Sequence, residues 1–104
     1  MDFENLINLL KILTTALEKN NFEEDDKQKI QYLSIELGKI KNQIPSYSKL
    51  EELQKIVTDL EVKYDDFNDL SYYFNPLYVT IRHNIHAEEV KKLREENKRK
   101  REMN

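Results

Sequence analysis

The sequence predicts an all-α protein, and two features of its 104 residues support this class. Glycine occurs once and proline twice, whereas β-sandwiches and barrels usually need many such residues in their turns. Apolar residues also recur at alternating spacings of three and four, the period of a helix with one buried face. We therefore expect two antiparallel helical hairpins, 1–44 and 46–104, that form a four-helix bundle. The bundle is expected as a monomer or an intertwined dimer, with a charged C-terminal helix that protrudes.

The first helix is expected over residues 3–17. Asp2 precedes it as the expected N-cap, because a carboxylate can accept hydrogen bonds from the free amides of the first turn. Lys19, Asn20 and Asn21 follow as a stop. The expected core stripe consists of Phe3, Leu6, Leu10, Leu13 and Leu17, widened by Ile7, Leu9, Ile12 and Ala16.

The second helix is expected from the acidic cluster 23–26 to Ile44. Negative charge at a helix N-terminus stabilises the helix through its macrodipole. Gly38 lies within this segment, and Pro45 ends it, since proline disfavours the α conformation in the preceding residue. The expected core stripe consists of Ile30, Leu33, Leu37, Ile40 and Ile44.

The third helix is expected to begin at Ser48, because Ser48 and Glu51 fit the capping-box pattern. It is expected to run for about 26 residues, or about 39 Å, until Asn75 and Pro76 interrupt it. Its stripe consists of Leu50, Leu53, Val57, Leu60, Tyr64, Phe67, Ser71 and Phe74.

A fourth helix is expected to restart at Asn75 as N-cap with Pro76 as the first helical residue. Phe74 and Val79 would then form a hydrophobic staple across this start. Twelve of the residues from 88 to 102 are charged, so we expect this helix to leave the body and to fray towards its end. Its apolar residues are Leu77, Tyr78, Ile81 and Ile85, followed by Ala87, Val90 and Leu93.

Charge divides the chain into two parts. Residues 1–90 contain 10 basic and 17 acidic residues, whereas residues 91–104 contain seven basic and three acidic residues. We therefore interpret residues 1–90 as an acidic helical bundle domain and residues 91–104 as a basic helical extension.

Catalytic and cofactor-binding motifs are absent from the sequence. A single glycine excludes glycine-rich nucleotide-binding motifs, and the lack of cysteine excludes thiolate metal sites and cysteine nucleophiles. His83, His86 and Glu89 would share a helix face, but their spacing differs from the usual helical zinc pair. Most of the acidic residues, which include 23–26, Asp65, Asp66 and Asp69, are expected on solvated faces or at helix starts. We therefore predict no cofactor, no metal and no enzymatic activity.

The aromatic residues are concentrated in one part of the chain, because six of the ten lie between residues 64 and 78. Tyrosine is a favoured anchor residue in protein interfaces, although core packing would also explain Tyr64, Phe67 and Phe74. The predicted partner-binding residues are Tyr64, Phe67, Tyr72, Tyr73 and Tyr78.

The C-terminal extension offers an alternative, nucleic-acid-binding surface, because clustered basic residues can contact phosphates. Interleaved glutamates oppose this interpretation, since they would form i, i+4 ion pairs within the helix. These expected pairs are Glu88–Lys92, Glu95–Arg99 and Glu96–Lys100. The candidate nucleic-acid-binding residues are Lys91, Lys92, Arg94, Lys98, Arg99, Lys100 and Arg101.

Two family resemblances accompany these patterns. Arg82 and His86 resemble the arginine–histidine pair of some helical ribonucleases, which have a longer spacer between the two residues than this chain does. In size and architecture the chain also resembles bacteriocin-immunity proteins, and residues 13–19 are the stretch that looks similar. That resemblance implies a cytosolic four-helix protein with a C-terminal tail.

We expect a cytoplasmic protein, because the sequence contains neither a secretory signal nor an apolar run of about 20 residues. The predicted function is binding to another protein as a small regulator or inhibitor, of the kind found in phages and mobile elements. An acidic body of this kind could occupy a basic groove on its partner. Self-association as a homodimer is also compatible with the long second hairpin.

Overall fold

The computed structural model describes residues 3–102, and every regular element within that range is helical. The prediction of an all-α protein is therefore confirmed. The elements are α1 (Glu4–Lys19), α2 (Glu24–Ile40), α3 (Tyr47–Lys63), the short 3₁₀ helix η1 (Asp65–Phe67) and α4 (Leu70–Glu102).

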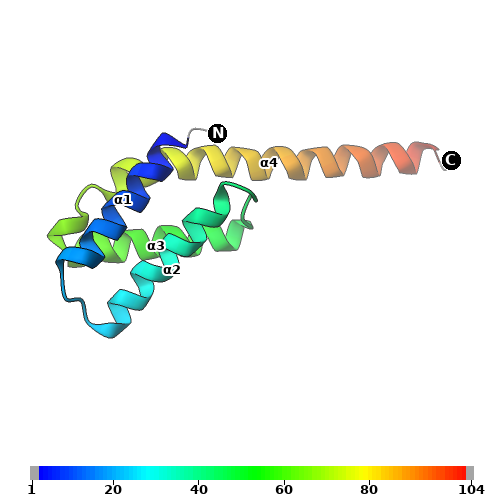
Figure 1. Ribbon diagram of the computed structural model, residues 1–104. Coiled ribbons are helices and arrows are strands. Elements are labelled where there is room, and N and C mark those ends of the chain that lie inside the picture. Colours follow the sequence, from blue (N-terminus) through cyan, green and yellow to red (C-terminus); the bar gives the residue numbers. More distant parts are fainter. Residues whose placement is uncertain (1–2, 103–104) are drawn as a thin grey trace.

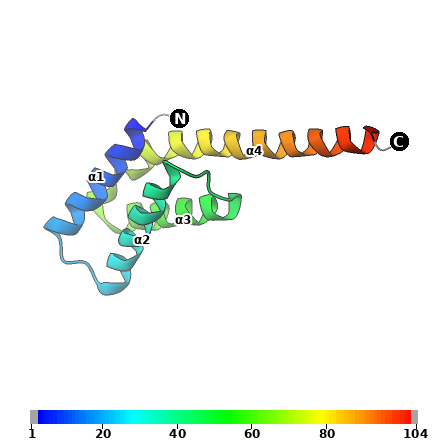
Figure 2. The same ribbon diagram turned by 45° about the vertical axis from the view of Figure 1, so that its right-hand side comes forward.

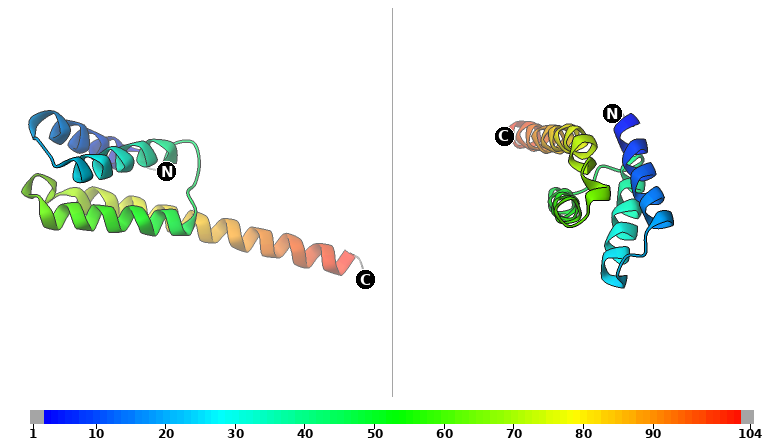
Figure 3. Two further views of the ribbon diagram at one scale, coloured as in Figure 1. Left: turned by 90° about the horizontal axis from the view of Figure 1, so that it is seen from below. Right: turned by 90° about the vertical axis from the view of Figure 1, so that its left-hand side faces the viewer.

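The helices form a compact body from which one helix projects. α1 lies beside α2, α3 lies beside the first part of α4, and the first pair crosses the second obliquely (Figures 1 and 3). α4 packs against α1 and α3, and α1 also packs against α2. The second half of α4 continues away from the other helices as a single rod (Figure 2). The molecule is therefore 64 Å long but only 25 and 21 Å across.

The hydrophobic core contains residues from all four helices and from η1. In α2 and α3 the buried residues follow the predicted stripes, except that Ile44 lies beyond the end of α2 and is partly exposed. In α1 the most buried face is rotated from the predicted one, because this helix packs against both α2 and α4. The buried residues are Leu6, Leu9, Leu13, Ala16, Ile30, Leu33, Leu37, Ile40, Leu50, Leu53, Val57, Leu60, Phe67, Leu70, Phe74, Leu77 and Ile81.

The last turn of the chain follows α3 and lies before Leu70, so the prediction that the third helix continues to Phe74 was wrong. α3 ends at Lys63, and Tyr64 adopts an extended backbone conformation with φ −127° and ψ 129°. Exposed carboxylates surround the turn, and the amide of Asn20 donates to Asp66 at 2.8 Å, which ties the turn to the end of α1. Apolar residues continue at helical spacing through this turn, which is why periodicity alone did not reveal it.

Pro76 lies inside α4, so the predicted restart at Asn75 and the staple between Phe74 and Val79 do not form. Proline lacks the amide that would donate to the carbonyl of Tyr72 in a regular helix. Its ring is exposed and therefore does not disturb the core. α4 then remains helical through Glu102, where fraying had been expected.

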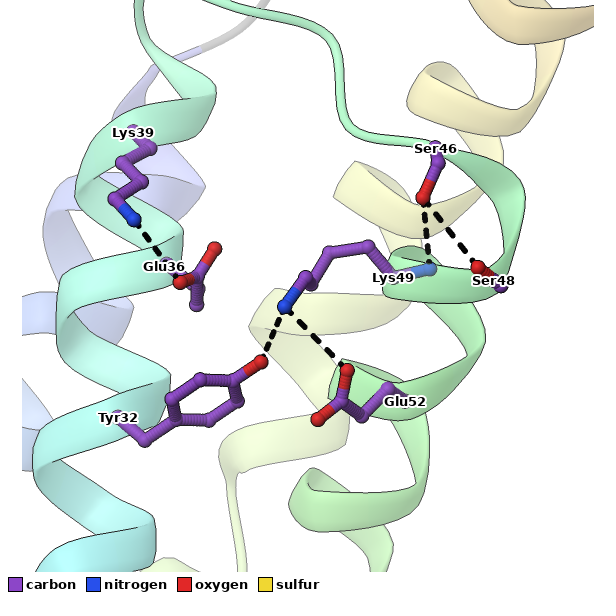
Figure 4. Close-up of polar contacts among 7 residues, drawn as sticks. All are labelled: Tyr32, Glu36, Lys39, Ser46, Ser48, Lys49 and Glu52. Atoms are coloured by element: carbon purple, nitrogen blue, oxygen red, sulfur yellow. Dashed lines mark hydrogen bonds and ion pairs between the residues drawn. The ribbon is translucent and has the colours of Figure 1, made fainter.

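The start of α3 is capped by Ser46, two residues before the predicted cap. The hydroxyl of Ser46 accepts a hydrogen bond from the amide of Lys49 at 3.2 Å, whereas the hydroxyl of Ser48 lies 3.5 Å from that of Ser46 (Figure 4). Pro45 therefore directly precedes the cap of α3, and α2 already ends at Ile40. The predicted N-cap Asp2 lies outside the described residues.

Polar contacts complete the association of α2 with α3. The ammonium group of Lys49 donates to the hydroxyl of Tyr32 and lies 3.5 Å from a carboxylate oxygen of Glu52 (Figure 4). The hydrogen bond to Tyr32 is the main reason that the pKa of Lys49 is raised. Gly38 has an open environment, since a Cβ atom there would meet nothing within 4 Å. The glycine is therefore not required for a close helix contact.

Candidate functional site

The five aromatic residues predicted to bind a partner are distributed over different environments. Phe67 is 0% exposed, so it belongs to the core and offers no surface. Tyr64 is half-buried against Phe67, with ring centroids 6.0 Å apart. Tyr72 is 76% exposed, and its ring lies edge-on to that of Tyr73, with ring centroids 5.1 Å apart. Tyr78 is half-buried elsewhere along α4.

Tyr64 participates in a polar cluster that joins the start of α2 to the end of α3. Its hydroxyl donates to the carboxylate of Asp26, and the ammonium group of Lys63 donates to the same oxygen at 2.6 Å. Phe22 covers this cluster, with its ring centroid 5.0 Å from that of Tyr64. The position of Tyr64 is thus explained by structural contacts within the body.

Asp26 lies in the first turn of α2, as expected for this acidic cluster, but it is buried. The hydrogen bond from Lys63, followed by that from Tyr64, lowers the pKa of Asp26, and the same contact with Asp26 raises the pKa of Lys63 and of Tyr64. A signal was present in the sequence, because Asp26 lies four residues before Ile30 and extends the core stripe by one turn.

A cleft of about 460 Å³ lies where α4 leaves the body. Tyr47, at the start of α3, lines one side, and the guanidinium of Arg82 lies 5.8 Å from the centre of its ring. The hydroxyl of Tyr78 donates to Glu51 beside this cleft, and that hydrogen bond raises the pKa of Tyr78 to about 12. Sequence reasoning missed Tyr47, although its place directly before the predicted cap put it at a helix end.

His83, His86 and Glu89 also line this cleft. Within residues 3–102, however, no group of three or more histidine or acidic side chains is arranged to hold a metal ion. The arrangement therefore gives no support to a metal centre at these residues. The cleft instead combines aromatic, cationic and apolar side chains on an open surface.

The projecting part of α4 exposes all seven basic residues of the alternative nucleic-acid site. Four of them, Lys91, Arg94, Lys98 and Arg101, have spacings of three, four and three, so they lie on one face of the helix. Among the described residues, none of the predicted pairs Glu88–Lys92, Glu95–Arg99 and Glu96–Lys100 forms an ion pair. The expectation that the helix neutralises itself through these pairs is therefore wrong.

The face of α4 directed away from the body carries large uncovered side chains. Tyr72 is 76% exposed, Val79 is 51% exposed and Leu93 is 59% exposed. We call this surface the outer face of α4 and define it by Tyr72, Val79, His83, His86, Val90, Leu93 and Asn97.

Comparisons with protein-family models, curated proteins and solved structures found no significant match to the chain. Within the described part of the chain, no helix is both long enough and apolar enough to span a bilayer.

Proposed function

We propose that the protein is a small, non-enzymatic regulator or inhibitor that acts by binding another protein through the outer face of α4. The observation that carries this proposal is the exposure of Tyr72, Val79 and Leu93 on one face of one helix. Exposed aromatic and aliphatic side chains are the groups that protein interfaces bury.

In this proposal the rest of the protein is a rigid support for α4. We propose that the support is a four-helix arrangement of two antiparallel hairpins, located in the cytoplasm. Its core residues on α4, Leu70, Phe74, Leu77 and Ile81, hold the helix firmly in the body. A firmly held helix presents its outer face at little cost in conformational entropy, which favours binding.

The proposal is tested by placing a photo-crosslinking amino acid at single positions in the full-length protein in its source cells. We expect crosslinked adducts from positions Tyr72, Val79 and Leu93. Val62 is the matched control, because it is an apolar residue that is 84% exposed but lies on α3. Adducts from Val62 at the same yield, or no adduct from the three α4 positions, would overturn the proposal.

A second candidate function is nucleic-acid binding by the basic face of Lys91, Arg94, Lys98 and Arg101. The absence of ion pairs between these four side chains and any described residue leaves their charges available for phosphates. Binding would then weaken steeply with added salt, and replacement of all four residues by alanine would abolish it. Fluorescence anisotropy with a labelled duplex measures both effects, and salt-independent binding would contradict this candidate.

A further inference from the structure

The outer face of α4 lies opposite the face that the body covers. A helix turns by about 100° per residue. Val79 is two residues from both Leu77 and Ile81, so it lies about 200° around the helix from these core positions. A partner on the outer face would therefore approach α4 from the side opposite these core positions, beside the cleft that Tyr47 of α3 lines.

The residues of the outer face follow a heptad pattern over the projecting part of α4. Successive positions are separated by four, three, four, three and four residues, as in the seam of a coiled coil. An asparagine within such a seam favours a dimer in one register, because each copy can satisfy the amide of the other. These seam positions are Val79, His83, His86, Val90, Leu93 and Asn97.

Charged residues flank the seam in a complementary order. Glu89 and Glu96 directly precede seam positions, whereas Arg94 and Arg101 lie on the other edge of the seam, five residues after each glutamate. In a parallel pair of helices in register, such a glutamate faces the residue five positions later on the second copy. Glu89 would face the second copy's Arg94, and Glu96 would face the second copy's Arg101.

An antiparallel pair would bring like charges together. Glutamate would then face glutamate along one edge of the seam, and arginine would face arginine along the other. Within the single chain, Glu89, Arg94, Glu96 and Arg101 form no ion pair with any described residue, so all four are available to a second copy.

We propose that the partner of the outer face is a second copy of this chain, whose α4 pairs with it in parallel and in register from Val79 to Arg101. This inference rests on the proposed function, because it uses the same face, and it specifies the partner. Only Val79, Val90 and Leu93 supply aliphatic contacts in this seam, so the dimer is expected to depend on protein concentration.

Single cysteines test the register. The chain has no cysteine of its own, so His83→Cys and Asn97→Cys each introduce a unique thiol. The two positions are about 21 Å apart along the helix, and only a parallel pair in register brings each thiol close to its own copy. We expect both variants to form a covalent dimer of about twice 12.6 kDa on mild oxidation.

Glu95→Cys is the matched control, because residue 95 lies about 200° around the helix from Asn97. It keeps the seam intact but should form no covalent dimer under the same oxidation. Failure of both seam variants to crosslink would overturn the proposal, as would crosslinking of only one of them or equal crosslinking of the control.

Charge reversal provides an independent test by sedimentation equilibrium. Reversing both glutamates, Glu89→Arg with Glu96→Arg, should weaken self-association by about ten-fold, since four exposed ion pairs become repulsive contacts. Mixing this variant with Arg94→Glu/Arg101→Glu should restore dimers that contain one copy of each. Circular dichroism checks that each variant keeps its helix content, and unchanged self-association of the two variants would refute the pairing.

The two proposals can fail separately. Photo-crosslinks to a different protein in a chain that remains monomeric would support the proposed function but overturn the dimer. Covalent dimers formed by purified protein support this inference whatever else binds in cells.

Discussion

Two leucines on α4 provide a direct measure of where the body ends. Leu77 is 2% exposed and lies in the core, whereas Leu93 is 59% exposed on the projecting part of the same helix. Each is replaced by alanine, so the chemical change is identical and the helix propensity changes little. The difference between the two variants therefore reports tertiary contacts alone.

The expected loss at Leu77 is large. Removing a buried leucine side chain to Cβ costs about 2–5 kcal/mol, because apolar surface is lost and a cavity forms. For a domain of this size, each 1 kcal/mol lowers the melting temperature by about 4–8 °C. A loss of about 2 kcal/mol would therefore lower it by at least about 8 °C.

Leu93→Ala should change the free energy of unfolding by less than about 0.5 kcal/mol. Both variants are compared with the unmodified chain by urea and thermal unfolding, followed by circular dichroism at a concentration where the chain is monomeric. Equal losses for the two variants would refute the assignment of α4 to a packed half and a free half. Retained stability of Leu77→Ala would refute the described core.

Further predictions concern the caps, the polar contacts and the proline. Ser46→Ala should destabilise the protein by about 1 kcal/mol, whereas Ser48→Ala should have little effect, as measured by urea unfolding. Asp26 has a lowered pKa, so it stabilises the fold above its unfolded value of 3.8, and Asp26→Asn should show a smaller loss of stability when the pH falls below that value. Tyr78 has a pKa raised from 10.0 to about 12, so its contribution is present below pH 10.0 and is lost as the pH rises through about 12. Ultraviolet titration of Tyr78→Phe should accordingly lack the tyrosine that ionises last. Pro76→Ala should raise the melting temperature, because alanine restores an amide donor inside α4 and contributes about 1–3 kcal/mol.

Each of these predictions has a contradicting result. A larger loss of stability from Ser48→Ala than from Ser46→Ala would show that Ser48, the predicted cap, caps α3. If acid lowers the stability of Asp26→Asn as much as that of the unmodified chain, the contact between Asp26 and Lys63 is refuted. If Tyr78→Phe removes a tyrosine that ionises near pH 10 and not the one that ionises last, its contact with Glu51 is refuted. A less stable Pro76→Ala would show that the ring has a packing role.

The sequence by itself determined the helical class and most of the core. Burial of one face requires apolar residues at spacings of three and four, and positions such as Leu33, Leu37, Leu53 and Val57 met that requirement. The sequence also determined the difference in net charge between residues 1–90 and 91–104, because that difference depends on composition alone.

The position of the last turn required the tertiary structure. Apolar residues keep their helical period from Leu60 through Tyr64 and Phe67, because both sides of the turn face the same core. The turn is held by residues from distant parts of the sequence, since Tyr64 donates to Asp26 and Asn20 donates to Asp66, and no local pattern reveals such partners. The helix restart predicted at Pro76 was wrong for a similar reason. Packing of α4 against α1 and α3 compensates for the hydrogen bond that proline cannot donate within the helix.

The candidate site also depended on which neighbours cover each side chain. Phe67 and Tyr72 are both aromatic and lie five residues apart, yet one is enclosed and the other is exposed. Phe67 lies in η1 within the core, whereas Tyr72 lies on the side of α4 that the other helices leave uncovered. Sequence periodicity determined that α4 has distinct faces, but only the packing of the body decided which of them remains available to a partner.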